Sequence, residues 1–279
     1  MAGIKKLSMT IVGATVFALG TSSAAQAAIF VSTSSEKVGI VDPSTGLFTP
    51  VASSPAFQDI AFSNEGTFFG ITVSQLYRVD LSSGTSSLIG NLGISTLNAL
   101  GFSPDNVLYG AGSDTGLYKI NTLTGAASLV AYIPGFVSGG DIVFDPVNNR
   151  FLGAAIYGAN TSLFSLETTG VAGKIGDIGF HIVGLAFDNG NLFGYTGSGD
   201  QIVIDPATGK GTFSKKVVDD SGSQVTTWGA ASAPSAGNPT TSVPEPTSVF
   251  GSLLAFSAFI AKMRMKRKRQ QKTLASTGS

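Results

Sequence analysis

One motif recurs along the middle of the chain at nearly constant intervals, and it constrains the fold more than any other feature. A short apolar segment ends in phenylalanine four times, and the intervals are 40, 42 and 43 residues. The four positions are Phe62, Phe102, Phe144 and Phe187. A fixed period of this length is typical of a protein built from copies of one supersecondary unit.

Each copy predicts four short strands. The phenylalanine strand is followed by a polar turn, a second apolar strand that ends in Gly, a third strand, a corner and a fourth strand. Four strands in 40 to 45 residues indicate one blade of a β-propeller. No copy carries the Gly-His and Trp-Asp pairs of the WD-repeat type, so the sequence resembles propellers in general. We expect the repeated phenylalanines to pack between blades, as core.

The corner between the third and fourth strands is the clearest repeated element. An acidic or Asn side chain can cap the turn, and Gly suits the position with positive φ. A set of metal ligands is the alternative, but fivefold repetition favours structural turns. The corners are Asp42–Gly46, Asp80–Gly84, Asn121–Gly125, Glu167–Gly170 and Asp205–Gly209.

The number of blades follows from counting copies. Residues 57–218 hold four complete units, and residues 29–51 supply the second, third and fourth strands of another. Thr227–Ser232 lies about one period after Phe187 and can provide the missing first strand. The two ends of the domain would then share a blade and leave no open sheet edge. The sequence therefore predicts five blades over residues 28–232, with an open four-blade array or a six-blade ring as alternatives.

The N-terminal segment predicts export. Lys5 and Lys6 precede an apolar run from Met9 to Gly20, which we expect to be helical. Ala25 and Ala27 then form a small-x-small cleavage pattern. This order is that of a secretory signal peptide over residues 1–27, which signal peptidase would remove after Ala27. An N-terminal membrane anchor is the alternative, but the run is shorter than the ~20 residues of a usual span.

The C-terminal segment has three parts in a fixed order. Residues 233–242 are rich in small and polar residues and predict a flexible linker. Val243, Pro244, Glu245 and Pro246 follow, and then the apolar stretch Val249–Ala261. The stretch predicts a short hydrophobic helix in the cytoplasmic membrane, with basic residues on the cytoplasmic side. These basic residues include Lys262, Arg264, Lys266, Arg267, Lys268 and Arg269.

Residues 243–269 resemble the PEP-CTERM protein-sorting domain of exported bacterial proteins. The resemblance implies recognition by a membrane sorting enzyme of the exosortase type, cleavage near the motif, and association with the cell envelope and exopolysaccharide. The tail of residues 270–279 extends beyond the basic cluster, where such domains usually end. An ordinary tail anchor is the alternative. Either interpretation places the middle of the chain outside the cytoplasmic membrane, in the envelope or at the outer surface.

The charge of the middle domain excludes some partners. Residues 28–242 carry 8 basic and 16 acidic side chains, which gives a net charge of about −8. Such a domain is repelled by nucleic acids and by anionic polysaccharides. A neutral glycan or a protein remains an acceptable partner. The chain has no Cys and one His, so we expect no thiolate or two-His metal site, and no motif indicates a cofactor.

The candidate ligand-binding residues are Asp59, Asn98, Asp141 and His181. Asp59 and Asp141 stand three residues before the repeated phenylalanine, where the innermost strands begin, and Asn98 and His181 lie near that position. Propeller ligands usually bind at the mouth of the central channel. We therefore expect a non-catalytic, surface-displayed propeller that acts in adhesion, in the extracellular matrix or in exopolysaccharide-associated binding. An exported glycosidase or lyase with carboxylates in the channel is the alternative.

Overall fold

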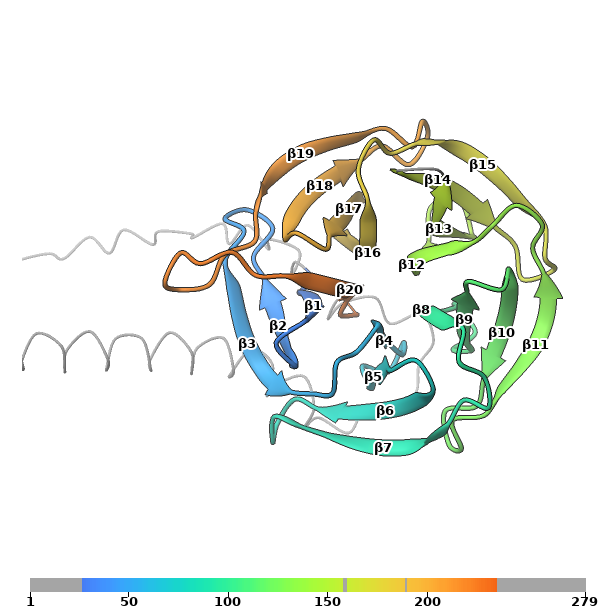
Figure 1. The fold of residues 1–279 in the computed structure, drawn as a ribbon, viewed down its shortest axis with the longest axis horizontal. Coiled ribbons are helices and arrows are strands. Elements are labelled where there is room, and N and C mark those ends of the chain that lie inside the picture. Colours follow the sequence, from blue (N-terminus) through green and yellow to red (C-terminus); the bar gives the residue numbers. More distant parts are fainter. Residues whose placement is uncertain (1–26, 158–159, 189, 235–279) are drawn as a thin grey trace, which may run out of the picture.

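The chain forms a closed ring of five four-stranded antiparallel sheets around a central axis (Figure 1). The computed structural model describes residues 27–157, 160–188 and 190–234. The predicted signal peptide, sorting motif and hydrophobic helix lie outside the described residues. Within these residues, no helix is long and apolar enough to cross a membrane.

Four blades are continuous in sequence, as the repeat predicts. Blade 2 contains β4 (Asp59–Phe62), β5 (Phe68–Ile71), β6 (Gln75–Asp80) and β7 (Thr85–Asn91). Blade 3 contains β8 (Leu97–Phe102), β9 (Leu108–Gly112), β10 (Gly116–Ile120) and β11 (Ala127–Tyr132). Blade 4 contains β12 (Ser138–Asp145), β13 (Arg150–Tyr157), β14 (Asn160–Leu166) and β15 (Ala172–Asp177). Blade 5 contains β16 (Ile182–Asp188), β17 (Asn191–Thr196), β18 (Asp200–Ile204) and β19 (Gly211–Lys216).

Blade 1 joins the two ends of the domain and closes the ring. It contains β20 (Thr227–Ser232), β1 (Ile29–Thr33), β2 (Lys37–Val41) and β3 (Phe48–Ser53), in that spatial order. The innermost strand is therefore the last in sequence, and it pairs antiparallel with the first, with Phe30 opposite Ala231. The predicted closure and the predicted number of blades are both confirmed.

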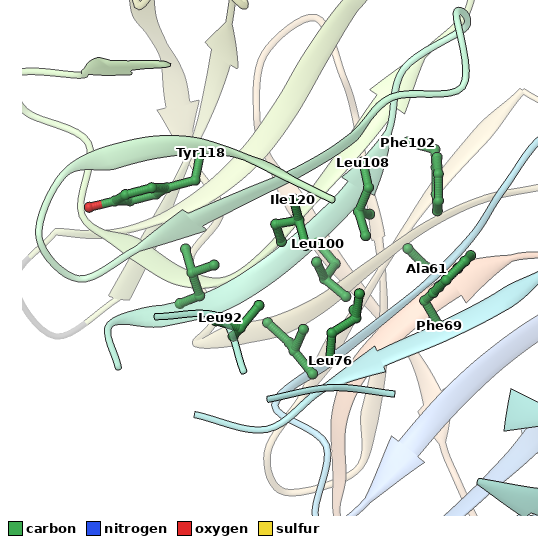
Figure 2. Packing of buried hydrophobic residues seen from close by; sticks show 11 residues of the cluster. Ala61, Phe69, Leu76, Leu92, Leu100, Phe102, Leu108, Tyr118 and Ile120 are labelled. Atoms are coloured by element: carbon green, nitrogen blue, oxygen red, sulfur yellow. The ribbon is translucent and has the colours of Figure 1, made fainter. Parts of the chain in front are cut away.

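The hydrophobic core is divided among the blade interfaces. Five clusters of buried residues each join two neighbouring blades. Figure 2 shows the cluster between blades 2 and 3, where Phe69 and Leu76 of one blade meet Leu100 and Phe102 of the next. Phe62 and Phe102 belong to such clusters, which confirms that they are core. Phe144 and Phe187 pack against the clusters between their blades but are only partly buried.

The five corners are structural turns, as predicted. In four of them the Asp or Asn side chain accepts a hydrogen bond from the N–H two residues later, as in Asp80 with Ser82 at 2.8 Å. The glycine of every corner has φ between 69° and 90°. Only glycine adopts this conformation at little cost.

The corner glycines also pack against the neighbouring blades. The turn pattern in the sequence did not predict these contacts. Each outer strand has a β-bulge, and the corner glycine of the next blade packs against the strand near it. A Cβ atom on Gly209 of blade 5 would lie 2.9 Å from the backbone of Gly176 in β15. A Cβ atom on Gly125 would lie 2.7 Å from Gly90 in β7. The bulges also blunt the exposed edges of the sheets.

Candidate functional site

Asp59 lies at the start of β4, on the innermost strand of blade 2, and is fully buried. Its Oδ1 accepts a hydrogen bond from the N–H of Ile60 at 2.8 Å. Its Oδ2 accepts one from the N–H of Leu100 in β8, at 2.5 Å. Both oxygens therefore have backbone donors, and one of these donors belongs to the next blade.

Asp141 occupies the equivalent position in β12 of blade 4, and its exposure is 1%. Its Oδ2 accepts a hydrogen bond from the N–H of Leu185 in β16, so this carboxyl group also reaches the next blade. Its Oδ1 is buried and has no hydrogen-bond partner among the described residues. The N–H groups of Ala230 and Ile142 lie near enough to lower the pKa of Asp141, but neither makes a hydrogen bond of normal geometry with Oδ1.

The closing strand β20 touches both carboxyl groups. Gly229 packs directly on Asp59, and a side chain at Gly229 would collide with the Oδ1 and Cα atoms of Asp59. The Ala230 N–H faces Asp141 from the same strand. Together the two carboxyl groups meet the backbone of all five blades.

Small residues at the equivalent positions of the other blades make room for this arrangement. Ala99, Gly184 and Gly229 stand where the repeat has Asp59 and Asp141. Each Asp is followed around the ring by a blade with a small residue, and the next N–H along that strand is the donor to the carboxylate. The alternation of Asp with Ala or Gly is the sequence signal that could have indicated a structural role.

Burial governs the charge of the pair. Removal from water raises the pKa of Asp59 well above its ordinary value, and the negative charge of Asp141 raises it further. Burial likewise raises the pKa of Asp141, against the lowering effect of the Leu185 N–H. Two neighbouring carboxylates cannot both stay ionised without water or a counter-charge. The pair therefore holds a proton to a higher pH than exposed aspartates do.

The other two candidate residues do not join this pair. Asn98 is half-buried in β8, and its Nδ2 donates to the carbonyl of Ser138 at 3.1 Å. His181 is exposed immediately before β16. No hydrogen bond in the described part of the chain links either residue to Asp59 or Asp141. The four predicted residues thus form one buried pair and two separate positions, not a single open site.

The opposite ends of the innermost strands surround a cavity of about 350 Å³, which we call the axial funnel. All five blades contribute to its lining, which is mainly apolar. Neither Asp59 nor Asp141 lines it, so the carboxyl pair is closed off from this side. Residues at one equivalent position in each inner strand, all at most 2% exposed, are part of the lining: Ile60, Leu100, Ile142, Leu185 and Ala230.

The sequence did not indicate the funnel, although its wall contains repeated phenylalanines. Phe62 and Phe102 are buried, whereas Phe144 and Phe187 are half-buried and present part of their rings to the funnel. A second cavity, of about 490 Å³, lies between blades 2 and 3 and shares Ser63 and Phe102 with the funnel lining.

Both ends of the propeller lie at the funnel. Pro234 is part of the funnel wall, and the N–H of Ala233 donates to the carbonyl of Ala28 at 2.8 Å. The chain therefore enters and leaves the ring at one face. Among residues 27–157, 160–188 and 190–234, no three His, Asp or Glu side chains are grouped so that they could hold a metal ion.

No protein-family model matches the chain, and no curated protein matches it. Solved structures do resemble it. A chain in the crystal structure of a nidogen/laminin complex is 12% identical, with 75% of this chain and 98% of that chain covered and a TM-score of 0.53. A structural genomics protein of unknown function from Bacteroides thetaiotaomicron is 13% identical, with 73% and 61% covered and a TM-score of 0.54. At these identities the similarity shows the propeller fold alone.

Proposed function

We propose that this protein is an exported binding propeller that is displayed on the outer side of the cytoplasmic membrane and has no catalytic role. The signal-peptide pattern of residues 1–27 and the sorting-signal pattern of residues 243–269 support export and tethering. Pro234, the last described residue, is part of the funnel wall. A C-terminal tether that continues from this point would attach the ring to the membrane through a single face.

The observation that carries the non-catalytic assignment is the complete burial of Asp59 and Asp141. A glycosidase needs two carboxyl groups that reach the substrate, one with a raised pKa. The pair has the raised pKa, which favours the enzyme alternative. Its exposure of 0% and 1%, together with the backbone donors on three of its four oxygens, leaves no access for a sugar and favours a structural role.

The axial funnel is the best candidate for the binding site. Its size and apolar lining suit a small apolar or aromatic group, and the half-buried rings of Phe144 and Phe187 offer stacking surface. We therefore propose a protein segment, or a neutral glycan of the matrix, as the partner. The nidogen/laminin chain supports this only as an example of the same fold within a protein–protein complex.

The test is made in cells that contain an exosortase-type sorting enzyme. The full chain should yield a product that begins at Ala28, by mass spectrometry, and that protease added to intact cells degrades. Replacement of Pro244, Glu245 and Pro246 by Ala should abolish processing at the C-terminus, whereas the nearby control Pro239→Ala should not. A product that keeps Met1 and stays protected from protease would contradict the proposal.

A second assay addresses catalysis. Purified full-length protein should show no cleavage of neutral polysaccharides. Turnover that disappears in both Asp59→Asn and Asp141→Asn, while the proteins remain folded, would establish the enzyme alternative instead.

A further inference from the structure

The buried carboxyl pair lies next to the strand that closes the ring. Gly229 and Ala230 of β20 contact Asp59 and Asp141, respectively. Because β20 is the last strand in sequence and completes blade 1 beside β1, the ring stays closed only while β20 stays in place. A change in the charge of the pair therefore takes place in direct contact with the strand that closes the ring.

The hydrogen-bond donors around the pair indicate where its proton resides. Both oxygens of Asp59 accept backbone N–H groups, so neither is free to carry a hydrogen without placing it against another donor. Asp141 Oδ2 is also occupied, by the Leu185 N–H. Among the four carboxyl oxygens, only Asp141 Oδ1 makes no hydrogen bond of normal geometry within the described residues. The Asp141 side chain also raises the pKa of Asp59 by its charge and by the hydrogen bond between the two carboxyl groups. The proton is therefore shared between the two side chains, and the open position of Asp141 Oδ1 is where we place it.

We propose that the Asp59–Asp141 pair is a proton-dependent latch, in which a proton on Asp141 Oδ1 holds the two carboxyl groups together and loss of that proton releases β20 and opens the ring. The ionised pair would leave two negative charges buried side by side at the axis. Exposure to water stabilises such charges. Because β20 contacts both carboxyl groups, we expect it to be displaced when the pair is ionised.

Within the described residues, no basic side chain is among the main influences on the charge of the pair. β4, β8, β20 and β1 carry no titratable side chain apart from Asp59 itself. β12 and β16 each end in one more aspartate. Asp145 interacts with Asn148 and Arg150, and Asp188 raises the pKa of Tyr195. Neither aspartate is among the main causes of the pKa shift of Asp59 or Asp141. A single cation between the two carboxylates would need more free oxygen ligands than Asp141 Oδ1.

The sign of the pH effect follows from the raised pKa. An unfolded aspartate releases its proton near its ordinary pKa of 3.8, whereas the folded pair keeps a proton well above that pH. The pair thus stabilises the ring fully at low pH, and this contribution falls as pH rises through the folded pKa. Between the unfolded pKa of 3.8 and the folded pKa, each such proton lowers the folding equilibrium constant by up to tenfold per pH unit.

The test uses denaturant unfolding of the full chain in mild detergent at a series of pH values above about 4.5. Trp228 is the only tryptophan of the protein and lies in β20, so its fluorescence reports on the closing strand itself. We expect the wild type to lose stability with rising pH. Asp141→Asn should remove most of this slope and remain folded, because its amide can donate to Asp59 and accept from Leu185.

Asp59→Asn is the matched control, with the same chemistry at the other member of the pair. Its amide N–H₂ must face the N–H of Ile60 or Leu100, so this variant should unfold at lower denaturant than Asp141→Asn at every pH. Three outcomes would overturn the proposal. These are a flat wild-type profile, the reverse order of the two variants, and a wild-type stability that rises with Ca²⁺ or Mg²⁺ and falls with EDTA, which would put a metal ion in place of the proton.

Discussion

Replacement of Gly209 by Ala tests how the blades are joined at the rim. Gly209 has φ of 75°, and a Cβ atom there would lie 2.9 Å from the backbone of Gly176 in the preceding blade. The positive φ costs an alanine about 1–2 kcal/mol. The collision with rigid backbone adds about 1–3 kcal/mol, which is typical of an overpacked site. We therefore expect Gly209→Ala to lower the free energy of unfolding by roughly 2–5 kcal/mol.

Gly66→Ala is the control, because Gly66 has φ of 81° and nothing lies within 4 Å of its Cβ position. This variant should show only the conformational cost of about 1–2 kcal/mol. Urea unfolding of the full chain, followed by Trp228 fluorescence, compares the two variants. With a denaturant dependence of ~2–3 kcal/mol per M, their midpoints should differ by about 1 M. Equal midpoints would refute a tight contact between Gly209 and Gly176.

Two further substitutions test contacts between and within blades. Ser32 is buried, accepts a hydrogen bond from the Gly229 N–H at 2.9 Å and donates one to the Phe57 carbonyl at 3.3 Å. Ser32→Ala should therefore lower the free energy of unfolding, measured in urea, by about 1–3 kcal/mol. Ser86→Ala is its control: Ser86 is half-buried, and the exposed hydrogen bond that it donates to the Ser53 carbonyl of the neighbouring blade should contribute much less. Equal losses would count against the importance of burial. Hydrogen bonds from Ser82 lower the pKa of Asp80 to about 2, so Asp80 stabilises the fold above pH 3.8 and this effect is lost as pH falls through 2. The melting temperature of Asp80→Ala should lie slightly below that of the wild type at pH 7 and approach it as the pH falls below 2. A difference that persists unchanged in acid would contradict this assignment.

Much of the architecture could be predicted because propeller blades repeat their sequence signals. The spacing of Phe62, Phe102, Phe144 and Phe187 fixed the period, and the corner glycines marked the turn before each fourth strand. The closure of blade 1 by Thr227–Ser232 could be predicted because the N-terminal residues supply only three of its strands. A closed ring requires the fourth strand to come from the other end of the domain. Each of these inferences depends on local pattern, which a single sequence contains.

The candidate site was harder to predict because its properties depend on distances across the ring. The repeat placed Asp59 and Asp141 at one position, but it did not show that inner strands converge closely enough to bury both. Nor did it show that the N–H groups of Leu100 and Leu185 would meet them. The funnel likewise depends on how the inner strands of all five blades are spaced around the axis. No pattern in the sequence predicts that spacing.

The most direct test of the closed axis is the protonation state of the pair at neutral pH. Infrared difference spectroscopy of the full chain between pH 5 and pH 8, in wild type and in Asp141→Asn, detects protonated carboxyl groups separately from carboxylates. The account predicts a protonated-carboxyl band that persists at pH 7 in the wild type and is absent from Asp141→Asn. A wild-type spectrum at pH 7 with carboxylates alone would contradict it, because it would mean that water reaches Asp59 and Asp141 through an open channel.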